Sequence, residues 1–405
     1  MNRTAMTSDN TVFTKGKLIN RYFLLVCLIN LCCCFAMYVY NNGIVMYFDY
    51  LGKDTSLSGM IAIPFAIAAI LGRIFGGYFT DHAGRRTMLL AAGLIFACSA
   101  MPFCMVVSVV ILFILRALHG FGYSILNTTL AAANMDTAPP DQTKRASGLF
   151  FVPSALSLAF CGVVTTFFTN RDMYTGMSLT VGSALFIGVI LTLFLNYEKK
   201  YHFKSTATRD ESSAQYKGVS AYIELSALPA VIISVIYNTS LSFLNGFMLL
   251  FATETGIPNP GLFFTVAAIL MVLLNLSSDF LQSHFSKLTL LLFTFAMFVF
   301  SYAFLALTGS AIAYYCVAVA YACGTGIVSP VLYMMALESA PIERRGAASS
   351  TLFMSNDIGV GIGSAIWGVM ITAIGYSGTM LAVACVVAAA AAAAIIVFKV
   401  LKAAH

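Results

Sequence analysis

Long apolar runs dominate this chain, and short polar segments separate them. The apolar residues are continuous rather than alternating, which favours helices over the strands of a barrel. A helix of about 20 residues is long enough to cross the hydrocarbon layer of a bilayer. The pattern therefore predicts twelve membrane-spanning helices, near residues 22–48, 57–80, 87–104, 106–134, 146–169, 174–196, 226–252, 260–280, 287–307, 310–337, 347–373 and 376–400.

The predicted helices fall into two sets of six. Between the sets lies the most polar stretch of the chain, residues 198–220, which is typical of a solvated linker. We therefore predict an N-terminal six-helix bundle over residues 1–197, a cytoplasmic linker over 198–220 and a C-terminal six-helix bundle over 221–405.

Composition supports a membrane protein. Hydrophobic residues make up 60% of the chain and charged residues 9%, and the mean hydropathy is +0.89. Soluble domains carry about 25% charged residues, so this chain has too few to cover a surface that faces water. In lipid, backbone polar groups must be satisfied within helices or a closed barrel. The fold class that follows is an all-α membrane protein.

The positions of Lys and Arg indicate an orientation. With the N-terminus inside, 18 of the 22 lie on the inner side, two (Lys53 and Arg171) lie outside, and two (Arg73 and Arg116) lie within helices. Basic residues concentrate on the cytoplasmic side of membrane proteins, so both termini are predicted to be cytoplasmic. The net charge of +6 then reflects topology, and no nucleic-acid partner is expected. Short outer loops without a glycosylation sequon indicate a bacterial inner membrane, and we expect a monomer.

The two halves resemble each other at an offset of close to 200 residues. Ala138–Pro139 recurs as Ala340–Pro341, and Gly120-Phe-Gly122 recurs as Gly324-Thr-Gly326. Six helices per repeat give both copies the same orientation, so the halves are predicted to be parallel. Substrate sites in such folds lie between the halves, near the middle of the membrane.

No motif indicates an enzyme, a metal site or a cofactor. The ten cysteines lie in or beside apolar runs without metal-ligand spacing, as small buried hydrophobic residues do. The chain has no HExxH or GxSxG motif and no GxxxxGK[ST] phosphate-binding loop, which excludes the corresponding hydrolases and ATP-driven pumps. The expected partners are the bilayer, a small-molecule substrate and protons.

Two motifs resemble those of one transporter family. The segment Gly77-Tyr-Phe-Thr-Asp81-His-Ala-Gly84-Arg85-Arg86 resembles the signature loop of the major facilitator superfamily, Gly-x-x-x-Asp-Arg-x-Gly-Arg-Arg/Lys, with His82 in place of a basic residue. The segment Arg116-Ala-Leu-His119-Gly120-Phe-Gly122 resembles its fourth-helix motif. The resemblance implies secondary transport by alternating access between two six-helix bundles. It also implies gating roles for Asp81, Arg85 and Arg86, with Asp81 near the start of the eleventh helix.

Other features bear on the direction of transport. The glycine-rich run Asp357–Gly363 resembles a group of bacterial facilitators associated with efflux of drugs and metabolites, which favours a proton-coupled exporter. Two departures weaken a specific antiporter assignment. The fifth helix lacks the Gly-Pro pair of drug/proton antiporters, and the repeat of the signature loop at Asp279–Lys287 is degraded. The alternatives are a proton-coupled importer of an organic acid or sugar and, in another class, a membrane sensor without transport.

Three charged residues, Arg73, Arg116 and Asp357, stand out because they lie away from the ends of the predicted helices. Asp357 lies about 12 residues beyond Arg345, which places it roughly 18 Å deep. Such residues usually face a cavity or a partner. Asp357 has two possible partners: pairing with Arg73, which we favour, would clamp the halves together, and pairing with Arg116 would place both in the substrate route. We hypothesise that Asp357 takes up and releases a proton as its arginine contact breaks and forms; the alternative is a static ion pair.

Polar residues on helices 1, 4, 7 and 10 are candidates for the substrate cavity, because these helices line the cavity in the superfamily. Each one could instead form a hydrogen bond between helices. Arg116 is the only strong charge among them, which favours a substrate with an anionic or carbonyl group. The candidates are Asn30, Tyr38, Asn41, Asn42, Arg116, His119, Asn127, Asn238, Ser240, Asn245 and Tyr333.

Overall fold

The computed structural model describes residues 18–139, 142, 146, 149–200, 223–341 and 345–403. In these residues the regular structure is helical throughout. The linker predicted at 198–220 falls almost entirely outside them, so the predicted domain boundaries stay a prediction.

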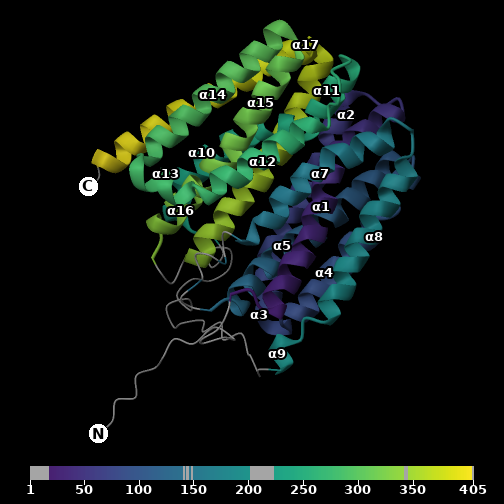
Figure 1. The fold of residues 1–405 in the computed structure, drawn as a ribbon, viewed down its shortest axis with the longest axis vertical. Coiled ribbons are helices and arrows are strands. Elements are labelled where there is room, and N and C mark those ends of the chain that lie inside the picture. The colour runs from purple at the N-terminus through teal and green to yellow at the C-terminus, as the bar shows by residue number, and fades with distance from the viewer. Residues whose placement is uncertain are drawn as a thin grey trace.

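The described residues of the N-terminal half form six membrane crossings; Figure 1 shows how these helices are arranged. Polar or turn-forming residues end each apolar run; Asn20, for example, caps the first helix by accepting from the backbone N–H groups of Tyr22 and Phe23. The second crossing combines two helices that meet at Ile61. The helices are α1 (Arg21–Tyr50), α2 (Thr55–Met60), α3 (Ala62–Ala83), α4 (Arg85–Ala100) with the 3₁₀ turn η1 (Phe103–Met105), α5 (Val109–Thr137), α7 (Val152–Thr169), α8 (Tyr174–Leu193) and the short α9 (Tyr197–Lys200).

The C-terminal half is built in the same way. Its first crossing combines α10 and α11, and its fourth combines α15, a π-helical turn and α16. The elements are η5 (Leu225–Ala227), α10 (Leu228–Gly246), α11 (Met248–Glu254), α12 (Leu262–Leu276), α13 (Ser278–His284), α14 (Lys287–Thr308), α15 (Ala311–Cys323), η6 (Gly324–Val328), α16 (Ser329–Ser339) and α17 (Arg345–Ala403).

Helix α17 supplies the last two crossings. The chain reverses at Gly375, whose φ of 71° and ψ of 178° are not helical and favour glycine. Ten helices of the described chain are long and apolar enough to cross a membrane; the longest of these is α17, and the segment Leu262–Asn275 is a shorter apolar helix. The prediction of a twelve-helix, all-α membrane protein is confirmed.

Large apolar side chains cover the outside of the bundle, among them Phe300, Leu307 and Ile312. In water such a surface would drive aggregation, whereas in lipid it is the expected solvent-facing surface.

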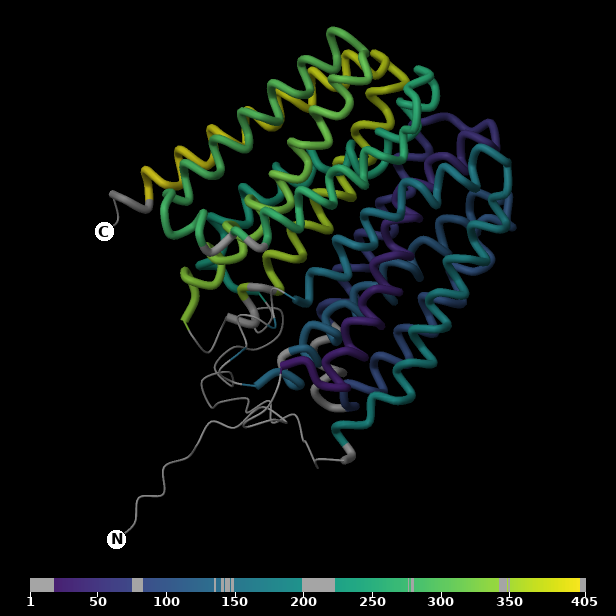
Figure 2. The backbone as a smooth tube through the Cα atoms, viewed as in Figure 1, coloured from purple at the N-terminus to yellow at the C-terminus, as the bar shows by residue number. Residues whose placement is uncertain are grey.

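The two halves contact each other chiefly through α17, which packs against α2 and α3, and through α7, which packs against α12. Figures 1 and 2 show the halves meeting at the end that carries α2 and α11 and lying apart at the ends that carry α9 and α13. We call the first the predicted outer end and the second the predicted inner end.

Candidate functional site

A buried ion pair links the two halves. The Nε of Arg73 on α3 donates to Oδ2 of Asp357 on α17 at 2.6 Å, and its Nη2 donates to Oδ1 at 3.4 Å. Arg73 is 7% exposed and Asp357 is 8% exposed, so neither charge is solvated. A fork-to-fork contact of this kind is among the stronger hydrogen-bonded pairs in proteins. The structure thus pairs Asp357 with Arg73 rather than with Arg116.

Neighbouring contacts hold both partners in position. Arg73 also donates to the hydroxyl of Thr128 at 3.4 Å, and its guanidinium lies 5.5 Å from the centre of the Phe353 ring. Asn356, next to Asp357, accepts from Asn238 at 2.9 Å. Asn238 therefore makes a hydrogen bond between α10 and α17 inside the C-terminal half and supports the carboxylate side of the pair indirectly.

Arg116 on α5 lies in a different environment. Its Nη2 donates to Oδ1 of Asn41 at 3.1 Å, and its guanidinium lies 4.3 Å from the centre of the Phe65 ring. It is 6% exposed, and its Nε has no hydrogen-bond partner. In the part of the chain that the structure describes, the ion pairs are Arg73–Asp357, Arg85–Asp136 and Lys287–Glu338, so no carboxylate pairs with Arg116.

Arg116 lines a small cavity between the halves. Its walls come from α1, α2, α3 and α5 on one side and from α10 and α17 on the other. Its volume is about 30 Å³, which is enough for a few water molecules and too small for an organic substrate. The polar residues that line it are Asn41, Ser58, Arg116, Ser242, Asn245 and Ser364.

Three of these residues, Asn41, Arg116 and Asn245, were predicted from the sequence, and the three serines were not. Serines are common in membrane helices and bond readily to their own helix backbone, so nothing in the sequence distinguishes a cavity serine. Ser58, for example, donates to the carbonyl of Thr55 at 2.7 Å.

Several other candidates make hydrogen bonds inside one half. Asn30 donates to the carbonyl of Phe150 at 2.9 Å, and the Tyr38 hydroxyl lies 3.1 Å from that of Ser154. Asn42 donates to the carbonyl of Tyr38 at 3.2 Å. The contacts of Asn30 and Tyr38 fit the interhelical alternative, whereas that of Asn42 stays within α1. None of the three candidates lines the cavity.

Ser240 behaves in the same way in the C-terminal half. Its hydroxyl donates to the carbonyl of Ile236 at 3.3 Å, and its own carbonyl accepts from the Tyr302 hydroxyl. Asn127 and Tyr333 are half-buried and also lie away from the cavity lining. The Tyr333 ring packs 5.9 Å from that of Phe353, beside the Arg73–Asp357 pair.

His119 is enclosed within the N-terminal half. Its ring stacks on Tyr40 at 5.2 Å and packs on Phe96 and Phe103 at 5.7 and 5.2 Å between ring centres. It is 0% exposed, and neither ring nitrogen has a hydrogen-bond partner. The sequence suggested a cavity position because His119 is a polar residue on the fourth predicted helix, one of the four that line the cavity in the superfamily. The structure places the aromatic ring of Tyr40 in contact with it, and Tyr40 rather than His119 lines the cavity.

The predicted inner end of the N-terminal half holds a second cluster. The Nε of Arg85 donates to Oδ2 of Asp136 at 3.1 Å, and the Tyr197 hydroxyl donates to the same oxygen at 3.0 Å. Burial raises the pKa of Asp136, although Arg85 and Tyr197 both favour its ionised form. Burial, reinforced by the nearby carboxylates, also raises the pKa of Tyr197.

Glu198 completes this cluster at the start of α4. Its carboxylate accepts from the backbone N–H of Arg85 at 2.7 Å and from that of Arg86 at 3.1 Å. A carboxylate at a helix N-terminus satisfies unpaired donors and the helix dipole. Asp136, Tyr197 and Glu198 were not predicted; their signal is that each lies within a few residues of an inner helix end. The side chain of Asp81 lies outside the described residues, so its contact with the eleventh helix stays a prediction.

The halves also touch at the predicted outer end. The Thr372 hydroxyl on α17 donates to Oδ1 of Asp54, the residue that caps α2, at 2.8 Å. Next to this bond the helix backbones meet at two glycines. A Cβ at Gly59 would lie 2.2 Å from the carbonyl oxygen of Ser364, and one at Gly368 would lie 2.7 Å from that of Thr55. The structure is therefore closed at this end.

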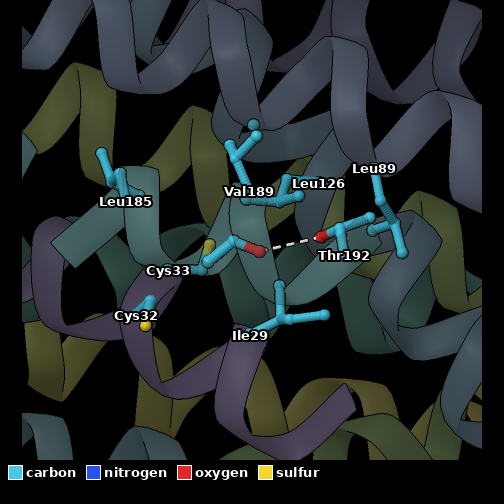
Figure 3. Close-up of a pocket in the computed structure, with 10 residues that line it drawn as sticks. Ile29, Cys32, Cys33, Leu89, Leu126, Leu185, Val189 and Thr192 are labelled. Atoms are coloured by element: carbon cyan, nitrogen blue, oxygen red, sulfur yellow. Dashed lines mark hydrogen bonds between the residues drawn. The ribbon is translucent and has the colours of Figure 1, made fainter. Parts of the chain in front are cut away.

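Figure 3 shows another pocket, within the N-terminal half between α1, α4, α5 and α8. It is about 10 Å³ in volume, and its lining is mostly aliphatic. The hydroxyl of Thr192 donates to the carbonyl of Gly188 at 2.9 Å. With no charged side chain in its walls, this pocket is a small packing gap and lies apart from both arginines.

Comparison with known proteins gives partial sequence matches to curated relatives. Monosaccharide-sensing protein 1 of Arabidopsis thaliana is 26% identical over 171 residues, which cover 40% of this chain and 23% of that protein. The facilitated trehalose transporter Tret1 of Drosophila willistoni is 27% identical over 160 residues, which cover 40% of this chain and 17% of that protein. The chain thus matches less than a quarter of the length of either relative.

Solved structures match nearly the whole chain. A nucleoside transporter, NupG, has a TM-score of 0.74 at 13% identity and covers 94% of this chain and 100% of its own. A POT family transporter in complex with a thioalcohol conjugated peptide has a TM-score of 0.76 at 12% identity, over 94% and 96% of the two chains. A D-xylose-proton symporter has a TM-score of 0.72 at 14% identity, over 90% and 96%. At these identities the likeness shows the fold.

The family follows from a match along most of the chain. The profile of the Major Facilitator Superfamily matches residues 26–364, which include both motifs, the Arg73–Asp357 pair and Arg116. The protein therefore belongs to the Major Facilitator Superfamily, a family of transporters rather than of enzymes, and is an integral, multi-pass membrane protein.

Proposed function

We propose that this chain couples transport to protons through Arg73 and Asp357. The observation that carries the proposal is the buried, two-point ion pair between α3 and α17, one helix from each half. Alternating access requires the halves to move relative to each other about the site. An ion pair across their interface therefore has to break or rearrange in the cycle.

Protonation of Asp357 is the step that would release the pair. Burial favours the neutral form of a carboxyl group, whereas a guanidinium in contact favours the ionised form. When the contact is made, Asp357 holds its charge; when the halves separate, a proton is taken up in place of Arg73. Proton binding and helix movement are then linked, because each favours the same state.

Arg85 and Arg86 are proposed to act at the inner gate. Their backbone N–H groups donate to Glu198, which holds the start of α4, and the side chain of Arg85 donates to Asp136 on α5. We propose that this cluster keeps the inner ends of α4 and α5 together while the bundle moves as one body, with Asp81 contacting the start of the eleventh helix when the inner side is closed.

We propose uptake as the direction of transport. The glycine run Asp357–Gly363 favoured export in the sequence, but the structure gives these glycines a packing function: a Cβ at Gly361 would lie 2.4 Å from that of Ala66 on α3. The names of the relatives include a trehalose facilitator and a D-xylose-proton symporter, which support the importer alternative. Export remains the second candidate, supported by the resemblance of the glycine run.

The charge distribution supports the proposed orientation. Arg85, Arg86 and Lys287 lie at the predicted inner end, and Lys53 and Arg171 lie in loops at the predicted outer end. Basic residues concentrate on the cytoplasmic side, so we propose cytoplasmic termini and a bacterial inner membrane. We propose a monomer, because the cavity is formed within one chain.

The test is solute transport by purified protein in proteoliposomes under an imposed pH gradient. Candidate solutes are sugars, nucleosides, peptides and organic acids. Accumulation driven by an inward proton gradient supports proton-coupled uptake, and accumulation driven by the opposite gradient supports export. Accumulation that does not depend on the pH gradient would contradict proton coupling. If none of these solutes is transported, the result would favour the sensor alternative.

The Asp357→Asn variant separates coupling from substrate movement. Because Asn cannot take up the proton, this variant should exchange labelled for unlabelled substrate at equal pH but fail to accumulate it under a gradient. The matched control is Asp172→Asn, which removes an exposed carboxylate between α7 and α8 and should leave accumulation unchanged. If Asp357→Asn accumulates substrate under a pH gradient to the wild-type level, the proposed role of this residue is contradicted.

A further inference from the structure

Within the membrane crossings, the buried charges of the described residues do not balance. Among the described residues, three buried charged side chains lie at helix ends and three lie within membrane crossings. The first group is Arg85, Asp136 and Glu224, and the second is Arg73, Arg116 and Asp357. Arg73 and Asp357 neutralise each other. Arg116 therefore leaves one positive charge in the membrane interior, at the wall of the cavity between the halves.

An uncompensated charge inside a membrane is costly, and such residues usually serve a pathway or a ligand. The guanidinium of Arg116 is held in place on two sides, by the amide of Asn41 at 3.1 Å and by the ring of Phe65 at 4.3 Å. These neighbours are neutral and fix its plane without supplying a counter-charge. The free Nε leaves part of the donor fork available, and this fork matches a carboxylate.

The opposite wall of the cavity is polar but uncharged. Asn245, Ser242 and Ser364 from the C-terminal half line it. Asn245 accepts from the Tyr321 hydroxyl at 2.9 Å, which holds its side chain in position. An amide and hydroxyls recognise hydroxyl or carbonyl groups, and Phe247 adds an apolar face.

We propose that the substrate is a small organic monoanion whose carboxylate pairs with Arg116 and whose hydroxyl or carbonyl groups contact Asn245 and the serines of the C-terminal half. A monoanion balances the single surplus charge, whereas a dianionic phosphate would reverse it. Because its two ends contact different halves, such a substrate links the halves across the site, and the cavity has to widen to admit it. The substrate class stands on the cavity, and its driving force rests on the function proposed above.

The first experiment compares matched acids and neutral solutes. The full-length protein in proteoliposomes is offered radiolabelled gluconate, lactate and pyruvate, with glucose and xylose as neutral counterparts. We expect uptake of at least one carboxylate and little of the neutral sugars. Uptake confined to the neutral solutes, or no uptake of any of the three carboxylates, overturns the assignment.

The second experiment removes the proposed anion partner. Arg116→Gln keeps a polar side chain and should lower the apparent affinity for the transported carboxylate by about 10- to 100-fold, as expected for loss of a charge-assisted hydrogen bond. Arg116→Lys keeps the charge and should restore part of the affinity, which shows that the Arg116 position folds with another side chain. An unchanged affinity in Arg116→Gln overturns the assignment.

Arg171→Gln is the matched control. Arg171 also lies over an aromatic ring, that of Phe167 at 4.2 Å, but it is exposed in the loop between α7 and α8. Removing it takes away the same charge and the same type of ring contact outside the cavity. Transport of the carboxylate should be unchanged in this variant; a loss equal to that of Arg116→Gln would show a non-specific effect of positive charge and overturn the assignment.

Membrane potential distinguishes failure of this inference from failure of the proposed function. A monoanion carried with one proton moves no net charge, so an inside-negative potassium diffusion potential should leave uptake unchanged. If the potential slows carboxylate uptake, the anion travels without a proton, which overturns the coupling and supports the substrate class. If a neutral solute is taken up faster under the potential, the result supports proton coupling and contradicts the proposed substrate class.

Discussion

At the scale of single residues, the Arg73–Asp357 pair is better explained by a cycle than by stability. The free-energy cost of removing two charges from water offsets most of the gain from their attraction. Replacing a buried pair with neutral groups therefore often has little effect on stability. Removing only one partner leaves a buried charge uncompensated and is strongly destabilising. A contact that is stable when complete and unfavourable when incomplete suits a switch between two arrangements.

This reasoning predicts an asymmetry between single and double variants. Arg73→Gln should lower the free energy of unfolding by about 3–5 kcal/mol, because it leaves Asp357 buried without a counter-ion. The double variant Arg73→Gln with Asp357→Asn should recover most of that loss. Denaturant unfolding of the detergent-solubilised protein measures both.

The control is Lys287→Gln, which removes the half-buried partner of the exposed Glu338 and should change stability by about 0–1 kcal/mol. Additive losses in the Arg73→Gln and Asp357→Asn double variant would show that the two side chains are energetically independent.

At the scale of helices, the predicted outer end closes because α2 and α17 meet without intervening side chains. Gly59 and Gly368 allow the approach, because a Cβ on either one would lie 3.0 Å from the Cα of the other. Small residues permit this kind of close contact between membrane helices, and larger ones separate the backbones.

Gly368→Val should therefore favour the state that is open at the predicted outer end. Spin labels at Lys53 and Ser377, both exposed, report the separation of the two halves there. We expect the distance distribution to move to longer values than in the wild type. The control Gly188→Ala, whose added Cβ meets Cys32 at 3.3 Å inside the N-terminal half, should leave the distribution unchanged. A wild-type distribution in Gly368→Val would exclude this crossing as a determinant of closure.

At the scale of the whole molecule, we expect closure to depend also on the charge of Asp54, which accepts from Thr372 of the other half. The Thr372 hydroxyl, and after it Ser56, lower the pKa of Asp54 below its ordinary value of 3.8. A lowered pKa means that the ionised form favours the closed arrangement. This contribution is complete above pH 3.8 and is lost as the pH falls through the lowered value.

The expected outcome is that acidification of the outer compartment below about pH 3.8 lengthens the distance between the same two labels. Thr372→Val should lose most of this pH dependence, because the largest cause of the shift is removed. A pH response of wild-type size in Thr372→Val would exclude the Asp54–Thr372 contact as its source.

Hydropathy along the chain was sufficient to predict the number and type of membrane crossings. A crossing is specified residue by residue, by affinity for lipid over about 20 positions, so it needs no knowledge of neighbours. Gly375 lies between the runs predicted at 347–373 and 376–400, and the chain reverses direction there within α17. The loop motifs likewise identified the family, because they are local in sequence.

The partners of buried polar groups depended on tertiary structure. Asp357 is 284 residues from Arg73 in the sequence. It pairs with Arg73 rather than with Arg116 because of how α3 and α17 pack. Asn41 and Asn245 face the cavity, while His119 and Asn238 turn into their own halves. The sequence by itself determined the helices, the family and the charges that must be compensated. Only the tertiary structure decided which charge is compensated, because the rotation and relative height of each helix are set by contacts with distant segments.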